Sequence, residues 1–517
     1  MLTSRRLKVD KKLVYSVSFK ICPTQHQSLQ YLLQPRYYIS LPEFSAKVQG
    51  SKVCPGNMGA DHASAFADWA SNKGLGPVFQ IQLGQRTIVV ATSYRAIKQL
   101  WMDNPRVLIS RPRLYSVHGV YSKDKDFTVG TTPWSEECKY RRKTMATALN
   151  RNAIQSLNPM LAFESFLVIK QLFENSNYGQ NEINVRPYIQ LYTLNAILKI
   201  NYGTGLSSID DPLYPEIVKV ESEISQLRGT SSNWQDYIPL CRLWPAKAWR
   251  ILYYRKRQDK YLNYFLNRIL ADIANGTEKP CVATNILKRK LDFAAVKSIS
   301  QTMISAGGAN ISACLYFGIG YLSSPQGQDI QEQAYRAIME AYPDGDAMDK
   351  GLEENIPYMA AFVQELLRLY PVVPMSSPRE SGEETTFQNA TIPAGSTFFM
   401  DAQAANLDPE QFPDPKKFNP SRYFEKQGRI TALPHYTYGA GSRMCIGLHI
   451  ANREMFILFT HLISAFKILP EKNFDPRILD FASCNTCPKA FTAQAKDFKV
   501  VLVPRNPASL ETWLRQR

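Results

Sequence analysis

The chain has 517 residues, 44% of them hydrophobic, which excludes a disordered polar chain and allows a sizeable core. Its formal net charge of +16 reflects either a scattered basic surface or an acidic partner, such as membrane headgroups or an acidic protein. Because the sequence has no basic tail and no zinc-finger spacing, we expect no nucleic-acid partner.

Nine irregularly spaced cysteines argue against a secreted disulfide framework, and the isolated pair Cys484 and Cys487 is weak evidence for zinc.

The first elements are poorly patterned. Residues 1–50 form an irregular segment without a clear membrane anchor. Its best apolar stretch, Leu13 to Phe19, is shorter than the about 20 residues that cross a bilayer, and it lacks a signal-peptide pattern. We therefore expect a soluble or peripherally attached protein.

The rest of the chain alternates between helical and short extended patterns. In chain order, these are a short helix over 62–74, a hairpin over 77–92, a helix over 93–105, helices over 159–174, 188–200, 255–274 and 295–320, and a strand over 497–505. The pattern predicts a mainly α fold with small β-sheets, as a single domain over 51–505. A C-terminal tail over 506–517 follows it.

One cysteine, Cys445, lies in the glycine-rich stretch GAGSRMCIG over 439–447, directly before an apolar run with helical spacing. Glycine permits positive φ and close approach to a bulky group. A helix N-terminus favours a thiolate. These features favour a thiolate metal ligand with an exchangeable position opposite. The alternative is a small buried cysteine in a turn.

A charged pair interrupts an apolar helical stretch further upstream. Glu365 and Arg368 are spaced i, i+3 among apolar residues, so they share one helix face and point into the structure. A buried pair needs further partners. Arg422, in the sequence FNPSRY, is available to supply one.

Together these motifs resemble the cytochrome P450 family. YGAGSRMCIG is similar to its heme loop, ELLR to its E-x-x-R helix and FNPSRY to its F-x-P-x-R segment, in the family's order. The resemblance covers roughly 50 to 505. It implies the single-domain cytochrome P450 fold, iron protoporphyrin IX as cofactor and oxidation of an organic substrate with O2.

The resemblance also implies roles for individual residues. Cys445 would be the axial thiolate on the heme iron. Arg443 and Arg379 match positions that reach the heme propionates, where a guanidinium fork suits a carboxylate. His435 stands where some members have an ordering histidine, although it also fits a plain loop histidine. The structural triad would be Glu365, Arg368 and Arg422.

The stretch over 295–320 resembles the family's oxygen-binding helix, with Ala306 and Gly307 at its small-residue start. We expect these small residues to leave space for dioxygen and substrate. The acid and threonine that usually follow are replaced by Ala309 and Asn310. Alanine cannot relay a proton, but the Asn310 amide can donate a hydrogen bond and hold a water. Ala306 and Asn310 are spaced i, i+4 and share a face.

This departure leaves two reactions open. In the first, the enzyme inserts one oxygen atom, with protons relayed by water or by the substrate's own polar group. In the second, it isomerises or rearranges a peroxide or another pre-oxidised intermediate. A non-catalytic heme sensor is a further alternative, disfavoured by the thiolate loop.

A basic segment, PWSEECKYRRK, resembles the family's W-x-x-x-R helix, although Cys138 occupies the expected arginine position. We therefore expect Trp134 and Arg142 to contact a propionate. The other basic residues would dock the acidic NADPH-cytochrome P450 reductase. They are Lys139, Arg141 and Lys143.

Wider similarities point to fungal phenylacetate-hydroxylase-like and secondary-metabolism members of the family. The substrate would be an aromatic or amino-acid-derived small molecule, and the loss of the acid and threonine favours a secondary metabolite over phenylacetate. Substrate contacts are expected from 111–130, 220–245, 372–378 and 486–492. By family resemblance, the protein would lie on the cytoplasmic side of the endoplasmic reticulum, where it would contact the membrane peripherally.

Overall fold

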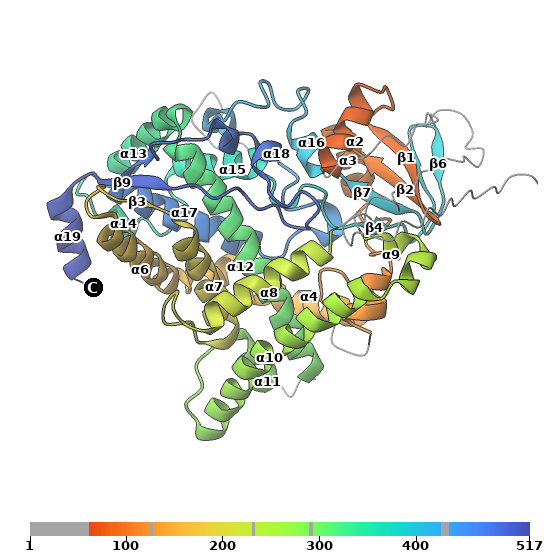
Figure 1. The fold of residues 1–517 in the computed structure, drawn as a ribbon, viewed down its shortest axis with the longest axis horizontal. Coiled ribbons are helices and arrows are strands. Elements are labelled where there is room, and N and C mark those ends of the chain that lie inside the picture. The colour runs from red at the N-terminus through yellow and green to blue at the C-terminus, as the bar shows by residue number, and fades with distance from the viewer. Residues whose placement is uncertain (1–60, 124–127, 230–232, 289–292, 425–433, 517) are drawn as a thin grey trace, which may run out of the picture.

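The computed structural model describes residues 61–123, 128–229, 233–288, 293–424 and 434–516 (Figure 1). The predictions for residues 1–50 and for the stretch from Leu13 to Phe19 lie outside these ranges. The described part is mainly helical with three small sheets, as predicted.

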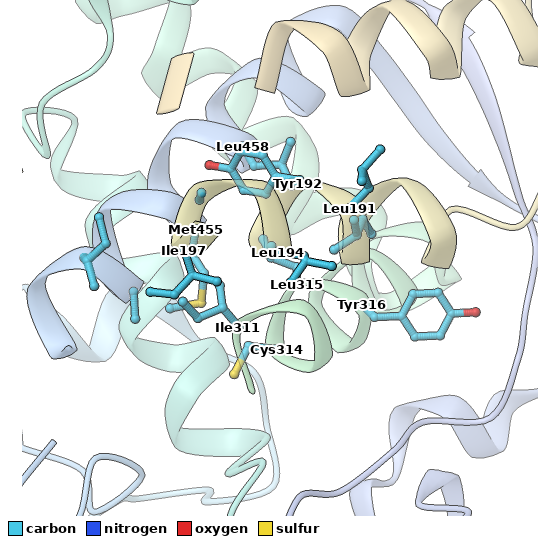
Figure 2. Packing of buried hydrophobic residues seen from close by; sticks show 14 of the residues in the cluster. Leu191, Tyr192, Leu194, Ile197, Ile311, Cys314, Leu315, Tyr316, Met455 and Leu458 are labelled. Carbon is cyan, nitrogen blue, oxygen red and sulfur yellow. The ribbon is translucent and has the colours of Figure 1, made fainter. Parts of the chain in front are cut away.

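Long helices form the body, and the predicted helices are confirmed. They are α6 (Asn158–Ser176), α7 (Arg186–Tyr202), α10 (Ala246–Asn275), α12 (Phe293–Ser323), α15 (Pro357–Leu369) and α17 (Leu448–Ala465). In Figure 1, α12 runs through the middle of the helical part. Figure 2 shows how its apolar side chains meet those of α7 and α17, with Ile197, Ile311 and Met455 close together in the core. Burial of this continuous apolar interface is the main stabilising contribution.

The largest sheet assembles from distant segments. The predicted hairpin is confirmed as β1 (Val78–Leu83) and β2 (Arg86–Ala91), paired antiparallel. Parallel to β2 lies β7 (Thr397–Met400), with Val90 opposite Phe399, and antiparallel to β7 lies β4 (Arg379–Glu380). This order places Arg379 at the sheet edge nearest the cavity described below.

Shorter elements connect these parts. Further helices are α2 (His62–Ser71), α3 (Tyr94–Ile97), α4 (Glu136–Ala148), α5 (Arg151–Gln155), α8 (Leu213–Leu227), α9 (Trp234–Tyr237), α11 (Val282–Lys288), α13 (Gln328–Ala341), α14 (Ala347–Lys350), α16 (Ala402–Asn406), α18 (Phe481–Cys484) and α19 (Pro507–Arg515). The π-helices are η1 (Lys98–Asp103) and η2 (Tyr115–Tyr121), and the 3-10 helices are η3 (Pro239–Leu243), η4 (Pro325–Gly327), η5 (Pro420–Tyr423), η6 (Gly441–Arg443) and η7 (Pro476–Leu479). Strands β3 (Glu182–Ile183), β8 (Phe466–Pro470) and β9 (Val500–Pro504) form a second sheet, and β5 (Thr385–Phe387) pairs with β6 (Ala390–Ile392).

The residues expected as a C-terminal tail contain helix α19. The Asn506 side chain caps this helix by accepting from Ser509 N. Leu510 and Trp513 are buried, and the Trp513 ring lies 5.1 Å from that of Phe166 on α6. An amphipathic helix of this kind is stabilised by the surface it covers.

Among the described residues, one helix is long and apolar enough to cross a bilayer, namely α12. Its most apolar window is 61% buried within the protein. A core helix of a globular protein meets the same criteria of length and composition, so α12 is explained by its packing.

Candidate active site

A cavity of about 300 Å³ lies between α12 and the loop that precedes α17. Its lining is mainly apolar, with a few polar and charged side chains. The sequence-predicted site residues on its wall are Arg142, Ala306, Gly307, Asn310, Arg379, Arg443 and Cys445. Each of the four segments expected to contact a substrate contributes, through residues that include Arg111, Glu221, Ser225, Val372, Ser377, Phe491 and Thr492.

The cysteine loop is shaped by glycines in the left-handed region, at φ +74° for Gly439 and +64° for Gly441. A Cβ on Gly441 would lie 2.2 Å from the Trp101 carbonyl oxygen, so only glycine fits this close approach. The loop is closed by Cys445 N, which donates to Tyr438 O at 2.9 Å. These contacts direct the Cys445 side chain into the cavity.

Cys445 keeps part of its surface exposed on the cavity wall, although dense protein surrounds its sulfur. Burial raises the pKa of the Cys445 thiol, against the lowering effects of Gly447 N–H and Arg142. The protein by itself therefore does not favour the thiolate form of Cys445, in contrast to the expectation from the sequence. A metal ion bound at the sulfur would supply the missing positive charge, because a coordinated thiol loses its proton.

An arginine cluster lies beside the loop. It consists of Arg379 and Arg443, neither of which forms an ion pair with a described carboxylate. The charge of Arg443 adds to the effect of burial on Arg379. Burial lowers the pKa of Arg379 to about 9 and that of Arg443 to about 10. Arg379 Nη1 and Arg443 Nε also have no hydrogen-bond partner among the described residues. Buried cations of this kind indicate a site for an anionic ligand.

Two arginines near this cluster are held by backbone oxygens. Arg111 donates to Gly130 O at 3.1 Å and to Pro378 O at 2.7 Å, which ties three segments together and indicates a structural role. Arg142 of α4 donates to Met444 O at 3.1 Å and thereby holds the cysteine loop against α4.

Trp134, predicted to contact the ligand, is absent from the cavity lining. It lies behind Arg443, whose guanidinium carbon is 5.6 Å from the centre of the Trp134 ring. A guanidinium over an indole face is attracted to it. Trp134 therefore positions Arg443 within the described structure.

The predicted charged pair is fully buried and joined by its expected third member. Arg368 Nε and Nη2 donate to the two Glu365 oxygens at 2.7 and 2.8 Å, and Arg422 Nε donates to Glu365 Oε1 at 3.0 Å. Arg368 also donates to Asn406 O at 2.8 Å and Pro415 O at 2.7 Å. These bonds attach α15 to the irregular segment before the cysteine loop. None of the three residues lines the cavity, so their role is structural.

His435 is buried below the loop. Its Nε2 lies 3.3 Å from Gln364 Oε1, and its ring is 5.7 Å from that of Tyr438. Burial, together with the charge of Arg368, lowers the pKa of His435 to about 3. The side chain is therefore a neutral residue that packs against Gln364 and Tyr438.

The opposite wall is formed by α12. Ala306 and Asn310 both border the cavity, as expected from their i, i+4 spacing. Asn310 Oδ1 accepts a hydrogen bond of 2.8 Å from Thr492 Oγ1. Thr492 was not singled out from the sequence, because nothing local connects it to α12.

Comparisons with known proteins agree with this geometry. A family model described as Cytochrome P450 matches residues 59–492. The chain belongs to the cytochrome P450 family.

Its relatives include fungal hydroxylases. The chain is 44% identical to phenylacetate 2-hydroxylase of Emericella nidulans, over 91% of this chain and 93% of that protein. It is 36% identical to 3-hydroxyphenylacetate 6-hydroxylase of the same organism, over 94% of this chain and 96% of that protein. It is 33% identical to a cytochrome P450 monooxygenase of Mycosarcoma maydis, over 89% of this chain and 86% of that protein. The predicted family, enzyme class and heme cofactor are thereby confirmed.

The cavity fits the heme that cytochrome P450 proteins bind. Cys445 presents a sulfur to it. Arg379 and Arg443 each offer a buried positive charge and one guanidinium nitrogen without a partner among the described residues, where the two carboxylates of a heme would need cations. The described residues contain no group of three or more His, Cys, Asp or Glu side chains that could hold a metal ion by themselves. A single protein sulfur ligand is what a heme iron requires.

One expectation about the basic helix α4 is wrong. Arg141 was expected to face a redox partner, but it is buried, with 8% of its surface exposed. Lys139 and Lys143 are exposed, and Lys139 forms a surface ion pair with Glu136 at 3.3 Å. Helical geometry turns position 141 inward with Cys138 and Met145.

Gly307 has a second structural requirement besides its place on the cavity wall. A Cβ on Gly307 would lie 2.8 Å from Ile197 on α7, so glycine is required for close packing of the two helices. At Gly308, the nearest atom to an added Cβ is Leu194 Cδ1, at 4.0 Å. Figure 2 shows Leu194 and Ile197 on the face of α7 that meets α12.

These neighbouring glycines therefore give a matched pair of variants. Gly307→Ala is expected to lower the free energy of unfolding by about 1–3 kcal/mol through overpacking. Gly308→Ala is expected to raise it by up to about 1 kcal/mol, because alanine favours helix and meets no obstacle. Chemical denaturation of the two heme-loaded variants measures the difference. Equal effects of the two substitutions would contradict this account.

Proposed function

We propose that this cytochrome P450 monooxygenase inserts one oxygen atom from O2 into an aromatic or amino-acid-derived small molecule in fungal secondary metabolism. The observation that carries the proposal is a single cavity bordered by the Cys445 sulfur on one wall and by Ala306 and Asn310 on the other. Its fungal hydroxylase relatives support the substrate class. The pair Ala309 and Asn310, where the family usually has an acid and a threonine, supports a substrate other than phenylacetate.

In this proposal, Cys445 would bind the heme iron, and Arg379, Arg443 and Arg142 would neutralise the propionates. When bound, heme supplies the iron centre at which O2 is activated. The mainly apolar wall excludes bulk water from the substrate. Asn310 Nδ2 is a hydrogen-bond donor at this wall, whereas the Ala309 side chain has no exchangeable proton. Protons would therefore reach the site through water or through the substrate's own polar group.

Electrons would come from an NADPH-cytochrome P450 reductase. The exposed lysines Lys139 and Lys143 lie on α4, the same helix that contacts the cysteine loop through Arg142. An acidic reductase face would be attracted to this surface, and the attraction is screened by salt. Raising the ionic strength should therefore slow electron transfer.

Peripheral membrane contact is supported by an exposed aromatic patch at η3 and the start of α10. Leu243, Trp244 and Trp249 are exposed by 72%, 55% and 66%, with the basic residues Arg242 and Arg250 beside them. Exposed tryptophans flanked by cations suit a lipid interface. By family resemblance, the proposed location of the protein is the cytoplasmic face of the endoplasmic reticulum.

The double variant Trp244→Ser, Trp249→Ser is expected to reduce binding to vesicles containing anionic lipid by about tenfold or more, since each indole buries a large apolar surface. Co-sedimentation with such vesicles measures this. The matched control is Phe163→Ser, which removes an exposed aromatic from α6. Equal losses in the two proteins would contradict a localised membrane patch.

Reconstitution tests the proposed reaction. The protein is combined with a fungal reductase, NADPH and ¹⁸O-labelled O2, and is offered aromatic acids and phenylalanine-containing cyclic dipeptides. The expected product carries one labelled oxygen and forms with NADPH consumption. A product that lacks the label, or the absence of NADPH-dependent product from every substrate, would overturn the proposal.

A further inference from the structure

A hydrogen bond across the cavity wall joins two segments that are 182 positions apart in the sequence. Thr492 Oγ1 donates to Asn310 Oδ1 at 2.8 Å, and both residues line the cavity. Thr492 is 6% exposed. A threonine hydroxyl thus reaches α12 at position 310, although α12 itself has no hydroxyl at 309 or 310.

The backbone that carries Thr492 is held in place by hydrogen bonds on both sides. Phe491 N donates to Ser225 O and Thr492 N donates to Ser225 Oγ, each at 3.0 Å, which attaches this loop to α8. On its other side, Ala493 N donates to Val372 O at 2.8 Å. The loop therefore cannot move the Thr492 backbone away from α12 without breaking these bonds.

This contact sets the direction of the Asn310 amide. A primary amide has one acceptor oxygen and one donor nitrogen, so an engaged oxygen leaves the nitrogen for the other side. Asn310 Nδ2 has no hydrogen-bond partner among the described residues. Asn310 therefore presents a donor to the cavity, whose lining also includes the apolar side chain of Phe491.

We propose that Thr492 is a positioning residue that makes Asn310 a hydrogen-bond donor for an acceptor oxygen of the substrate. Two sources share this chemistry, namely the carboxylate of an aromatic acid and the amide carbonyl of an amino-acid-derived product. The inference rests on the proposed substrate class. Beyond that class, it names an acceptor oxygen as the substrate group that Asn310 recognises, and Thr492 as the residue outside α12 that orients Asn310.

Equilibrium dialysis of the heme-loaded protein tests the inference without relying on turnover. The probes are phenylacetate, a phenylalanine-containing cyclic dipeptide and ethylbenzene, which lacks oxygen. Thr492→Val keeps the side-chain shape but removes the hydroxyl, and Asn310→Asp keeps the acceptor but removes the donor. Both variants are expected to bind the oxygen-bearing probe with about fivefold lower affinity, the usual effect of losing one hydrogen bond.

Two controls separate positioning from a general structural effect. Thr492→Ser restores the hydroxyl and is expected to bind the same probe within about twofold of wild type. Ethylbenzene binding is expected to stay unchanged in the two Thr492 variants. The probe that responds identifies whether a carboxylate or an amide carbonyl is recognised.

The outcomes distinguish the two proposals. If the wild-type protein binds an oxygen-bearing probe and Thr492→Val binds it equally well, the inference about Thr492 fails and the proposed function stands. Equal weakening of ethylbenzene would also overturn the inference, because the effect would then be structural. If the wild-type protein binds no oxygen-bearing probe and oxidises none, the proposed substrate class fails together with the inference.

Discussion

Cys445→Ala is expected to abolish substrate oxidation and to remove the red-shifted thiolate-heme band from the carbon-monoxide difference spectrum of the reduced protein. In the proposed site, Cys445 is the sulfur that borders the cavity from the glycine loop. An axial thiolate cannot be replaced by a methyl group, so the iron would lose the ligand on which the family's oxygen chemistry depends. The measurements are the spectrum and product formation with a fungal reductase.

Cys314→Ala is the matched control. Cys314 lies on α12 and also lines the cavity, but burial raises the pKa of its thiol to about 12, so it remains an uncharged packing group. This variant is expected to keep the thiolate-heme band and to lose only about 1 kcal/mol of stability. Retention of the band in Cys445→Ala, or its loss in Cys314→Ala, would show that Cys445 is not the iron ligand.

Arg368→Leu is expected to destabilise the protein by about 3–5 kcal/mol, because it leaves the Glu365 carboxylate buried with half of its charge pairing removed. Both side chains are 0% exposed, so water cannot replace the lost guanidinium. The backbone oxygens of Asn406 and Pro415 would also lose their donor. Little heme-loaded protein is expected. Arg368→Lys should recover part of the loss, since it keeps the charge but not the bidentate fork.

The pair Arg515 and Glu511 on α19 provides the control. It has a comparable helical spacing, but its side chains are 81% and 32% exposed. Arg515→Leu is therefore expected to change the free energy of unfolding by no more than about 0.5 kcal/mol. The yield of heme-loaded protein and its denaturation curve measure both variants. A similar loss in both would show that burial is not what makes Arg368 important.

Local sequence patterns predicted the features that depend on neighbouring residues. The periodicity of apolar residues identified α6, α7, α10 and α12, because helical spacing is repeated every few positions. The spacing of Glu365 and Arg368 predicted their pairing for the same reason. The inward position of Arg141 was missed, since a run of adjacent basic residues does not show which one the packing turns inside.

The sequence by itself determined the helical framework, the glycine-shaped loop around Cys445 and the membership of the cytochrome P450 family. Only the tertiary structure decided that Trp134 lies behind Arg443, that Ile197 requires glycine at position 307, and that Thr492 forms a hydrogen bond with Asn310. The physical reason is distance along the chain. Backbone propensity and side-chain spacing act over a few residues, whereas these contacts form only when packing brings remote segments together.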